Sequence, residues 1–366
     1  MRVVIAPDKF AGTLSAVEAA AAMARGWARR APDDELVQVP MSDGGPGFLD
    51  VLHAALDGEL HAVTVPDPYG VPVPAAVLRV GDTAYVESAQ AVGLHLTEPD
   101  DRRPEHGTTV GLGELLRAAL ETGPRRVVVG LGGSATNDAG AGMLAALGAT
   151  AGQGSLTSGP TGLAEVGDVD LAAAREAVGD VELVIASDVD NPLLGIHGAT
   201  KIFGPQKGLP DERLVTVDGW LQVFADATDR KLATRTGTGA GAAGGLGFAL
   251  LLLGGHRVSG LDVVAEAVGL DDLLTGAGLA LTGEGAFDFS SRAGKVPYGV
   301  AQLAAQHLVP CVALAGQVLV GSREMRALGV ESAYSLVELV GEERAMAAPV
   351  ESLEQLAERT ARTWSH

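Results

Sequence analysis

Four polar side chains, Ser134, Thr136, Asn137 and Asp138, lie among glycines in the segment GLGGSATNDAGAGMLAALG, residues 130–148. The β-branched run before it predicts a buried strand, and the small apolar run after it predicts a helix. Strand, glycine-rich turn and helix in this order point backbone N–H groups and a positive dipole end at one place, which suits a phosphate or another oxyanion. In the structural alternative, Gly132, Gly133 and Gly140 serve close packing and Asp138 caps the helix.

Acids also follow two predicted strands near the start of the chain. Residues 2–6 predict a strand with Asp8 and Lys9 behind it, and residues 36–40 predict a strand that leads to Asp43. Each loop is followed by a predicted helix, the first beginning with the capping-box pair Ser15 and Glu18. Open α/β sheets bind ligands at the carboxyl ends of their strands, so we expect Asp8 and Asp43 to face the same crevice.

Two later strands end in the same way. Residues 183–186 predict a strand before Asp188 and Asp190, which would point to opposite faces and so rarely share one metal ion. Either acid could act as a general base or hold Mg²⁺ through water, and an Asx-turn before Pro192 is the structural alternative. Residues 279–282 predict a strand that ends before Glu284, with Lys295 opening the next helix.

Composition limits the classes of function. The net charge of −20 argues against a nucleic-acid partner, and it would repel an anionic substrate unless local donors or a metal ion compensate. Cys311 is the only cysteine, so neither a disulfide nor a cysteine-based metal cluster is expected. The apolar run within residues 1–10 is too short for a signal peptide, and the apolar run of residues 248–253 is too short to cross a bilayer. We therefore expect a cytoplasmic protein with no membrane partner.

The length of 366 residues predicts two domains. Alternating strand and helix patterns fill the two ends of the chain, whereas residues 63–87 read as antiparallel hairpins. We predict an α/β protein whose doubly wound domain is discontinuous, built from residues 1–62 and 275–366, with a second α/β domain inserted at 63–274. The GxGxxG pattern at Gly239–Gly244 follows a predicted helix, residues 218–236, rather than a strand, so it indicates a dinucleotide site only weakly.

Anion-binding turns, loop lysines and isolated acids together fit phosphoryl transfer from a nucleotide, with Mg²⁺ to neutralise charge. The sequence has no Walker loop and no HRD or DFG set of the protein kinases. The residues by themselves predict a soluble α/β enzyme that handles a small phosphorylated or carboxylated substrate.

Seven segments extend this prediction: PDKFAGTLSAVEAA, SDGGPGFLDVL, GLGGSATNDAGAGMLAALG, SDVDNPLLG, ATKIFGPQKG, GAGAAGGLG and TGEGAFDFSSRAGK. In this order they resemble the glycerate kinase family, over residues 1 to about 318. The resemblance implies a flavodoxin-like domain with a second α/β domain, and an enzyme that phosphorylates D-glycerate with ATP and Mg²⁺, 2-phosphoglycerate being the favoured product.

The resemblance also implies a set of site residues. For binding of substrate or nucleotide it indicates Lys9, Gly44, Gly45, Gly132, Gly133, Ser134, Ala135, Thr136, Asn137, Asp138, Asp188, Asn191, Gln206, Lys207, Gly283, Glu284 and Asp288. Many relatives place their first lysine two positions later than Lys9, and many have glutamate where this chain has Pro46.

For catalysis the resemblance indicates Asp8, Asp43, Asp190 and Lys295, and we take Asp190 as first choice for the general base, with Asp8 and Asp43 as rivals. Lys295 and Lys207 would neutralise phosphate, the amides of residues 132–135 would bind phosphate or carboxylate, and Asp188 or Asp288 would hold Mg²⁺. The expected partners are small molecules, and a homo-oligomer is allowed. The alternatives are a kinase for another short hydroxy acid, a nicotinamide-dependent oxidoreductase and a solute-binding protein.

Overall fold

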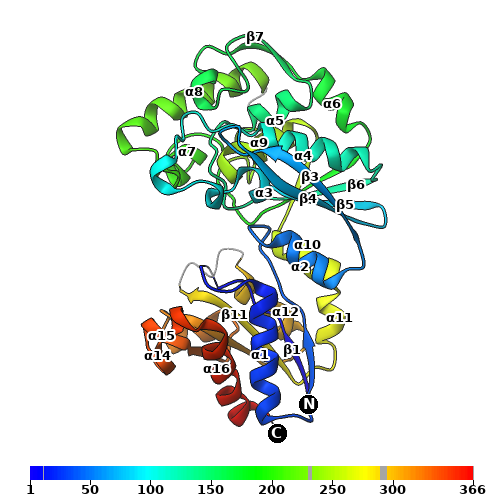
Figure 1. Ribbon diagram of the computed structural model, residues 1–366, viewed down its shortest axis with the longest axis vertical. Coiled ribbons are helices and arrows are strands. Elements are labelled where there is room, and N and C mark those ends of the chain that lie inside the picture. Colours follow the sequence, from blue (N-terminus) through cyan, green and yellow to red (C-terminus); the bar gives the residue numbers. More distant parts are fainter. Residues whose placement is uncertain (11, 230–232, 289–294, 366) are drawn as a thin grey trace. The chain divides into compact units, whose positions relative to one another are not determined.

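A computed structural model describes residues 1–10, 12–229, 233–288 and 295–365 (Figure 1). Residues 289–294 of the seventh segment lie outside the described residues. The chain forms two compact units, the first from residues 1–43, 50–56 and 261–366 and the second from residues 44–49 and 57–260. The predicted boundaries, 62/63 and 274/275, differ from these divisions because strand β3 already begins at Glu59 and helix α10 (Gly260–Val268) lies almost wholly in the first unit.

The first unit is built on one five-stranded sheet in which every neighbouring pair is parallel. Its strands are β1 (Arg2–Ile5), β2 (Glu35–Gln38), β11 (Leu279–Phe287), β12 (Cys311–Val318) and β13 (Ser332–Ser335). They lie in the order β13-β12-β11-β1-β2. Counted along the chain of this unit, that is the order 2-1-3-4-5 of flavodoxin-like sheets, which confirms the predicted doubly wound fold.

Helices of the first unit cover the sheet (Figure 1). The helix α1 begins at the predicted capping box, in which Ser15 Oγ accepts from the Glu18 amide at 3.2 Å and the Glu18 carboxylate accepts from the Ser15 amide at 2.9 Å. Trp27 of this helix is fully buried in the core. The helices are α1 (Ala16–Arg30), α2 (Phe48–Ala55), α10, α11 (Leu270–Leu274), α12 (Val296–Gln306), α13 (Ser322–Ala327), α14 (Leu336–Val340), α15 (Glu342–Ala347) and α16 (Pro349–Trp364), the first two residues of α2 being counted with the second unit.

The second unit has a six-stranded sheet in the order β10-β9-β6-β5-β4-β3. Strands β3, β4 and β5 are antiparallel neighbours, which confirms the predicted hairpins, while β5, β6, β9 and β10 run parallel. The bounds are β3 (Glu59–Pro66), β4 (Pro72–Val80), β5 (Thr83–Glu87), β6 (Arg126–Gly130), β9 (Glu182–Ala186) and β10 (His256–Val258). A separate antiparallel pair joins β7 (Thr150–Gln153) and β8 (Gly167–Asp170).

Helix α8 of the second unit ends earlier than the sequence predicted. It runs from Leu214 to Thr228, and the described residues 233–241 form turns, because the Asp229 carboxylate accepts from the amides of Thr234 and Arg235. The other helices are α3 (Ala89–Val92), α4 (Val110–Glu121), α5 (Ala141–Ala146), α6 (Ala172–Val178), α7 (Ala199–Phe203) and α9 (Ala242–Leu252). Short 3₁₀ turns cover Leu94–Leu96, Pro99–Asp101, Pro160–Leu163, Pro205–Lys207 and Asp211–Arg213.

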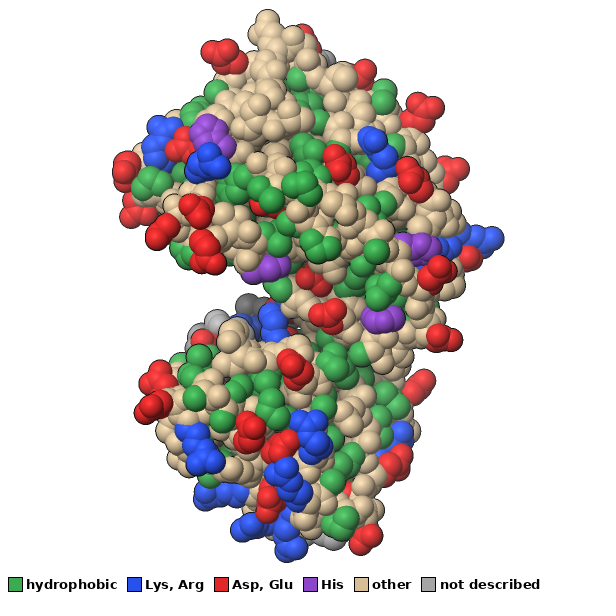
Figure 2. Space-filling model, viewed as in Figure 1, with side chains coloured by type: hydrophobic (Ala, Val, Ile, Leu, Met, Phe, Trp, Pro, Cys, Tyr) green, Lys and Arg blue, Asp and Glu red, His purple; other side chains and the backbone are tan. Residues whose placement is uncertain are grey.

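The surface of each unit mixes acidic and basic side chains, as the visible face in Figure 2 shows. In the part of the chain that the structure describes, no helix has the length and apolar character that crossing a membrane requires.

Candidate active site

Charged side chains of the first unit follow strands that are neighbours in its sheet. Asp8 follows β1, Asp43 follows β2, and Glu284 lies in the last part of β11. The prediction that this strand ends at residue 282 was wrong, because β11 keeps pairing with β12 as far as Phe287. The order of the strands reverses between β1 and β11, and doubly wound sheets bind their ligands at such a switch point.

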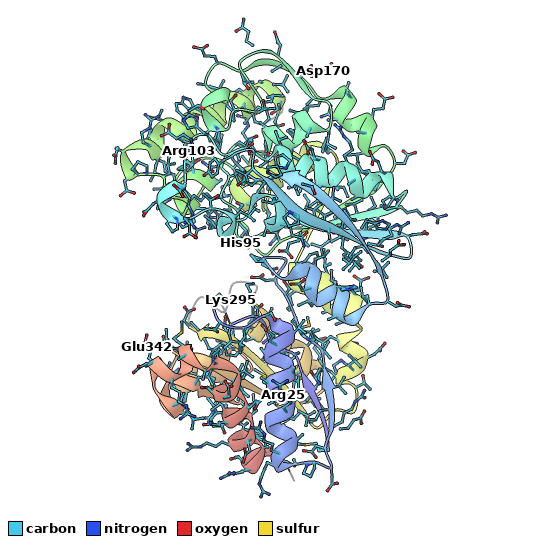
Figure 3. The ribbon with its side chains drawn as sticks, viewed as in Figure 1. Arg25, His95, Arg103, Asp170, Lys295 and Glu342 are labelled. Atoms are coloured by element: carbon cyan, nitrogen blue, oxygen red, sulfur yellow. The ribbon has the colours of Figure 1, made fainter. Side chains whose placement is uncertain are left out.

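Two lysines of this cluster each lie between two carboxylates. Lys9 Nζ is 3.7 Å from Asp8 Oδ1 and 3.7 Å from Asp43 Oδ1. Lys295 Nζ is 3.6 Å from Glu284 Oε2 and 3.7 Å from Asp288 Oδ1. The two lysine side chains remain 28% and 33% exposed, so both ammonium groups can meet a ligand. Figure 3 shows Lys295 at the edge of the first unit where β11 ends.

Asp8 and Glu284 are the buried acids of the cluster, with exposed fractions of 8% and 6%, whereas Asp43 and Asp288 are partly exposed. The Asp8 Oδ1 accepts the Lys9 amide at 2.7 Å. Burial raises the pKa of Asp8 to about 7, with Asp43 and Glu284 adding to the rise and Lys9 opposing it. A carboxyl group that ionises near neutral pH is suited to accept a proton from a substrate hydroxyl.

Gly283 serves the sheet beneath this cluster. Its carbonyl accepts the Asp8 amide at 2.8 Å, which fixes the loop after β1 to β11. A Cβ atom at Gly283 would lie 2.1 Å from the carbonyl oxygen of Leu314 on β12. The predicted binding residue Gly283 therefore has a packing role in the structure.

In the second unit, the glycines after β6 pack against the loop that contains Gly44 and Gly45. A Cβ atom at Gly132 would lie 2.5 Å from Gly45 Cα, and one at Gly44 would lie 2.6 Å from the Ala186 carbonyl oxygen. At Gly133 it would lie 2.8 Å from Pro46 Cγ. The two loops approach backbone to backbone, so these glycines have the structural role that the sequence analysis gave as the alternative.

Glu87, at the end of β5, holds the same loop and was not found by sequence reasoning. Its carboxylate is 5% exposed and accepts the amides of Gly47 at 3.2 Å and Leu49 at 3.0 Å. The sequence signal was a lone acid at the end of a predicted strand, whose partners are about forty residues away in the chain.

Asp138 also has a structural role. It is fully buried, and its oxygens accept from the amide and hydroxyl of Thr109, both at 2.9 Å, and from the amides of Gly140 and Gly142. Burial raises the pKa of Asp138, and these hydrogen bonds oppose the rise. The carboxylate thereby joins the loop to the start of helix α4 and to α5, which has only six residues.

Only some of the backbone amides of residues 132–135 are available for a ligand. The Ala135 amide donates to the Val92 carbonyl at 2.7 Å and is already engaged. Within the described ranges, the amides of Gly132, Gly133 and Ser134 have no protein acceptor. The expectation for residues 132–135 therefore narrows to residues 132–134.

Lys207 lies beneath this loop rather than on its surface. It is 2% exposed, and its Nζ donates to Ser134 Oγ at 2.7 Å and to the Thr136 carbonyl at 2.5 Å. Burial lowers the pKa of Lys207 to about 7, while the Asp138 carboxylate opposes the fall. Its neighbour Gln206 is exposed. Asn137 is buried and donates to Thr200 Oγ1 at 3.0 Å. Thr200 lies in the quoted segment ATKIFGPQKG but was not among the predicted site residues.

The acids after β9 have separate partners. Asp188 Oδ1 accepts the Gly260 amide at 3.2 Å, and Asn191 Nδ2 donates to the His197 carbonyl at 2.8 Å. Asp190 is 76% exposed, and its Oδ1 lies 2.8 Å from Nη2 of Arg257, a partner that the sequence analysis missed. Asp190 thus lacks the burial of Asp8.

The GxGxxG segment serves packing within the second unit. A Cβ atom at Gly244 would lie 2.0 Å from the Thr136 carbonyl oxygen, and one at Gly241 would lie 2.3 Å from that of Pro192. The Gly244 carbonyl also accepts the Ala139 amide at 3.0 Å. Because the preceding residues 233–241 form turns, the strand that a dinucleotide site requires is not there.

Metal binding was expected at Asp188 or Asp288. Among the residues that the structure describes, no three His, Cys, Asp or Glu side chains gather closely enough to hold a metal ion. Mg²⁺ usually takes only one or two protein carboxylates and completes its shell with water and substrate phosphates. The acids present therefore fit a magnesium ion that is bound mainly by a nucleotide.

Comparison with known proteins gives a consistent assignment. The sequence is 41% identical to a glycerate kinase of Bacillus subtilis (strain 168) over 92% of this chain and 90% of that protein, and 38% identical to a glycerate 2-kinase of Escherichia coli (strain K12) over 93% and 92%. A crystal structure described as glycerate kinase 2 from Salmonella typhimurium LT2 matches with a TM-score of 0.83 and 35% identity, covering 99% of this chain and 98% of that one. The sequence model of the glycerate kinase family matches residues 3–365, and the chain belongs to this family.

Proposed function

We propose that the protein transfers the γ-phosphoryl group of ATP to a hydroxyl group of D-glycerate, with 2-phosphoglycerate as the favoured product. Membership of the glycerate kinase family supports the reaction class, and the name of the Escherichia coli relative supports the position of the phosphate. The observation that carries the proposal is the buried acid Asp8 at the switch point of the first unit, beside the ammonium group of Lys9.

Asp8 is the general base of this proposal. Its carboxylate takes the proton of the substrate hydroxyl while the oxygen attacks the γ-phosphorus, and the bond from that phosphorus to the bridging β-oxygen breaks to release ADP. Asp190, the first choice from the sequence, is exposed and paired with Arg257, so it lacks the buried surroundings of Asp8. The base assignment therefore moves to Asp8, which the sequence analysis had as a rival.

The lysines of the first unit supply positive charge for this reaction. Lys9 and Lys295 present partly exposed ammonium groups that can contact phosphate or the substrate carboxylate. In the second unit, the amides of residues 132–134 supply hydrogen-bond donors for an anionic group. Mg²⁺ would be brought with the ATP phosphates and would neutralise their charge, and Asp288, which lies 3.7 Å from Lys295 Nζ, would be the residue that holds the ion.

Matched variants test the choice of base. Asp8→Asn removes the proton acceptor but keeps the size of the side chain, and we expect it to lower kcat by about 10²-fold or more. Asp190→Asn should change kcat by less than about tenfold. Both are measured with ATP, Mg²⁺ and D-glycerate in an assay coupled to ADP release. A larger loss in Asp190→Asn than in Asp8→Asn would return the base assignment to Asp190.

A further inference from the structure

Ser134 has an unusual hydrogen-bonding position. Its hydroxyl oxygen accepts from Lys207 Nζ at 2.7 Å, and a lysine ammonium group can only donate. While Lys207 is protonated, the proton of the Ser134 hydroxyl must therefore point elsewhere. In the part of the chain that is described, this proton has no acceptor. Lys207 thus fixes Ser134 as a donor with an unused proton.

The backbone near the Ser134 hydroxyl offers further hydrogen-bond donors. The amides of Gly132, Gly133 and Ser134 also have no acceptor among the described residues. Gly132 is partly exposed and Gly133 is exposed, so a ligand can reach this side of the loop. Buried polar groups of native proteins are normally paired, and Ser134 is 4% exposed, so its hydroxyl proton and amide call for an acceptor from outside the chain. The amides of Gly132 and Gly133 are open to solvent and are available to the same ligand.

The fold holds Lys207 in place for this task. It ends the 3₁₀ turn Pro205–Lys207, and its side chain is buried against the loop, where Nζ also donates to the Thr136 carbonyl at 2.5 Å. With an exposed fraction of 2%, the ammonium group offers almost no surface to a ligand. Any effect of Lys207 on binding must therefore pass through the loop that it contacts.

We propose that Lys207 is a positioning residue that orients the Ser134 hydroxyl. This hydroxyl and the amides of residues 132–134 together donate hydrogen bonds to one oxyanion of a substrate. The oxyanion is either the carboxylate of the hydroxy acid or a phosphate group of the nucleotide. This inference rests on the proposed function for its choice of ligands, and it replaces the expectation that Lys207 contacts phosphate directly.

Calorimetric binding at pH 6 tests the proposal without turnover, with D-glycerate and a non-hydrolysable ATP analogue as separate probes. We expect Ser134→Ala and Lys207→Met each to lower the affinity for one of the two ligands by about tenfold or more, which is the effect of losing a hydrogen bond to a charged group. The double variant should be no weaker than the weaker single variant, because both changes remove the same donor. The ligand that is affected identifies the oxyanion.

Two further variants separate positioning from folding. Ser134→Thr keeps the hydroxyl group and should keep the affinity within about threefold of the parent value. Lys201→Met makes the same change on the neighbouring helix α7 and should leave both affinities unchanged. If Lys207→Met does not fold, the contrast between Ser134→Ala and Ser134→Thr decides.

Three outcomes would overturn the inference. Ser134→Ala could bind both probes within about twofold of the parent value, Ser134→Thr could bind as weakly as Ser134→Ala, or the losses in the two single variants could multiply in the double variant. A parent protein that bound neither probe would refute the proposed function, and the inference with it.

Discussion

The charge state of Asp8 depends on its burial and on the charged residues around it. The group is buried, and its folded-state pKa of about 7 lies well above the ordinary value of 3.8. A carboxyl group with a raised pKa favours folding only while it is protonated, so this contribution to stability falls as pH rises from about 4 to about 7. Burial of an acid at a cost to stability is common at functional sites, where the shifted pKa is used in catalysis.

This environment predicts how kcat/KM depends on pH. Activity should rise with pH through a value near 7, because the base must be ionised. Asp43→Asn removes a negative charge that raises the pKa of Asp8, so the acid limb should move to lower pH. Lys9→Met removes the ammonium group that lowers it, so the limb should move to higher pH. Profiles from pH 5 to 9 measure both shifts.

The direction of the two shifts is the decisive result. Both variants also lose a charge that can contact substrate, so a lower maximum activity is compatible with either outcome. Acid limbs that stayed in place, or that moved in the same direction, would show that the titrating group is not Asp8.

Some of the residues of the candidate site could be predicted from the sequence. Asp8, Lys9 and Asp43 were found because each follows a recognisable strand, and local patterns reveal strand ends. The role of Glu87 and the burial of Lys207 were not found, because their partners lie 40 and 73 residues away along the chain and only the folded structure shows them. Asp138 accepts from the amides of Gly140 and Gly142, as the capping alternative predicted, but its contact with Thr109, 29 residues away, was not predicted.

At the scale of elements, helices α1 and α16 pack closely in the first unit. Glu354 of α16 pairs with Arg25 and Arg29 of α1, at 2.6 Å for Arg25 Nε, and Figure 3 labels Arg25 on its helix. A Cβ atom at Gly26 would lie 2.1 Å from the backbone carbonyl oxygen of Glu354. The absence of a side chain at Gly26 lets the two helices approach.

This contact predicts opposite effects for two glycine substitutions. Gly26→Ala should lower the free energy of unfolding by about 1–3 kcal/mol, because the added methyl group overpacks the helix contact. Gly219→Ala, within helix α8 and with nothing inside 4 Å of the added atom, should raise it by about 0.5–1 kcal/mol through helix propensity. Urea unfolding followed by tryptophan fluorescence measures both, since Trp27 and Trp220 adjoin the two sites. Equal shifts of the same sign would contradict the packing argument.

Element boundaries show where local reasoning fails. The capping box of α1 was predicted correctly because its two residues contact each other within one turn. Strand β11 was predicted too short, since its glycine-rich second half is stabilised by pairing with β12 rather than by its own propensity. Helix α8 was predicted too long. The Asp229 carboxylate accepts hydrogen bonds from the amides of Thr234 and Arg235, which would otherwise have continued the helical pattern.

At the scale of the whole molecule, the sheet of the first unit is assembled from both ends of the chain. Strands β1 and β2 come from the first forty residues, whereas β11, β12 and β13 come from residues after 278. The return of the βα pattern near the end of the sequence was enough to predict this discontinuous domain. Its limits depended on where individual helices pack, which sequence periodicity does not encode.

The net charge of −20 adds a constraint on any anionic substrate. At long range the chain repels phosphate and carboxylate groups, so binding must rely on donors and cations that act at short range. The paired lysines of the first unit are such groups, and so are the amides of residues 132–134 in the second unit, which have no acceptor among the described residues.

The central claim is that this chain phosphorylates D-glycerate. The most direct measurement is phosphorus NMR of a mixture of the full-length protein, ATP, Mg²⁺ and D-glycerate, with lactate and other short hydroxy acids as separate substrates. We expect ADP and a phosphomonoester to form in equal amounts, with the ester coupled to the C2 proton of glycerate. ATP that stays intact with D-glycerate, while NADH binds or another hydroxy acid is phosphorylated in its place, would contradict the account.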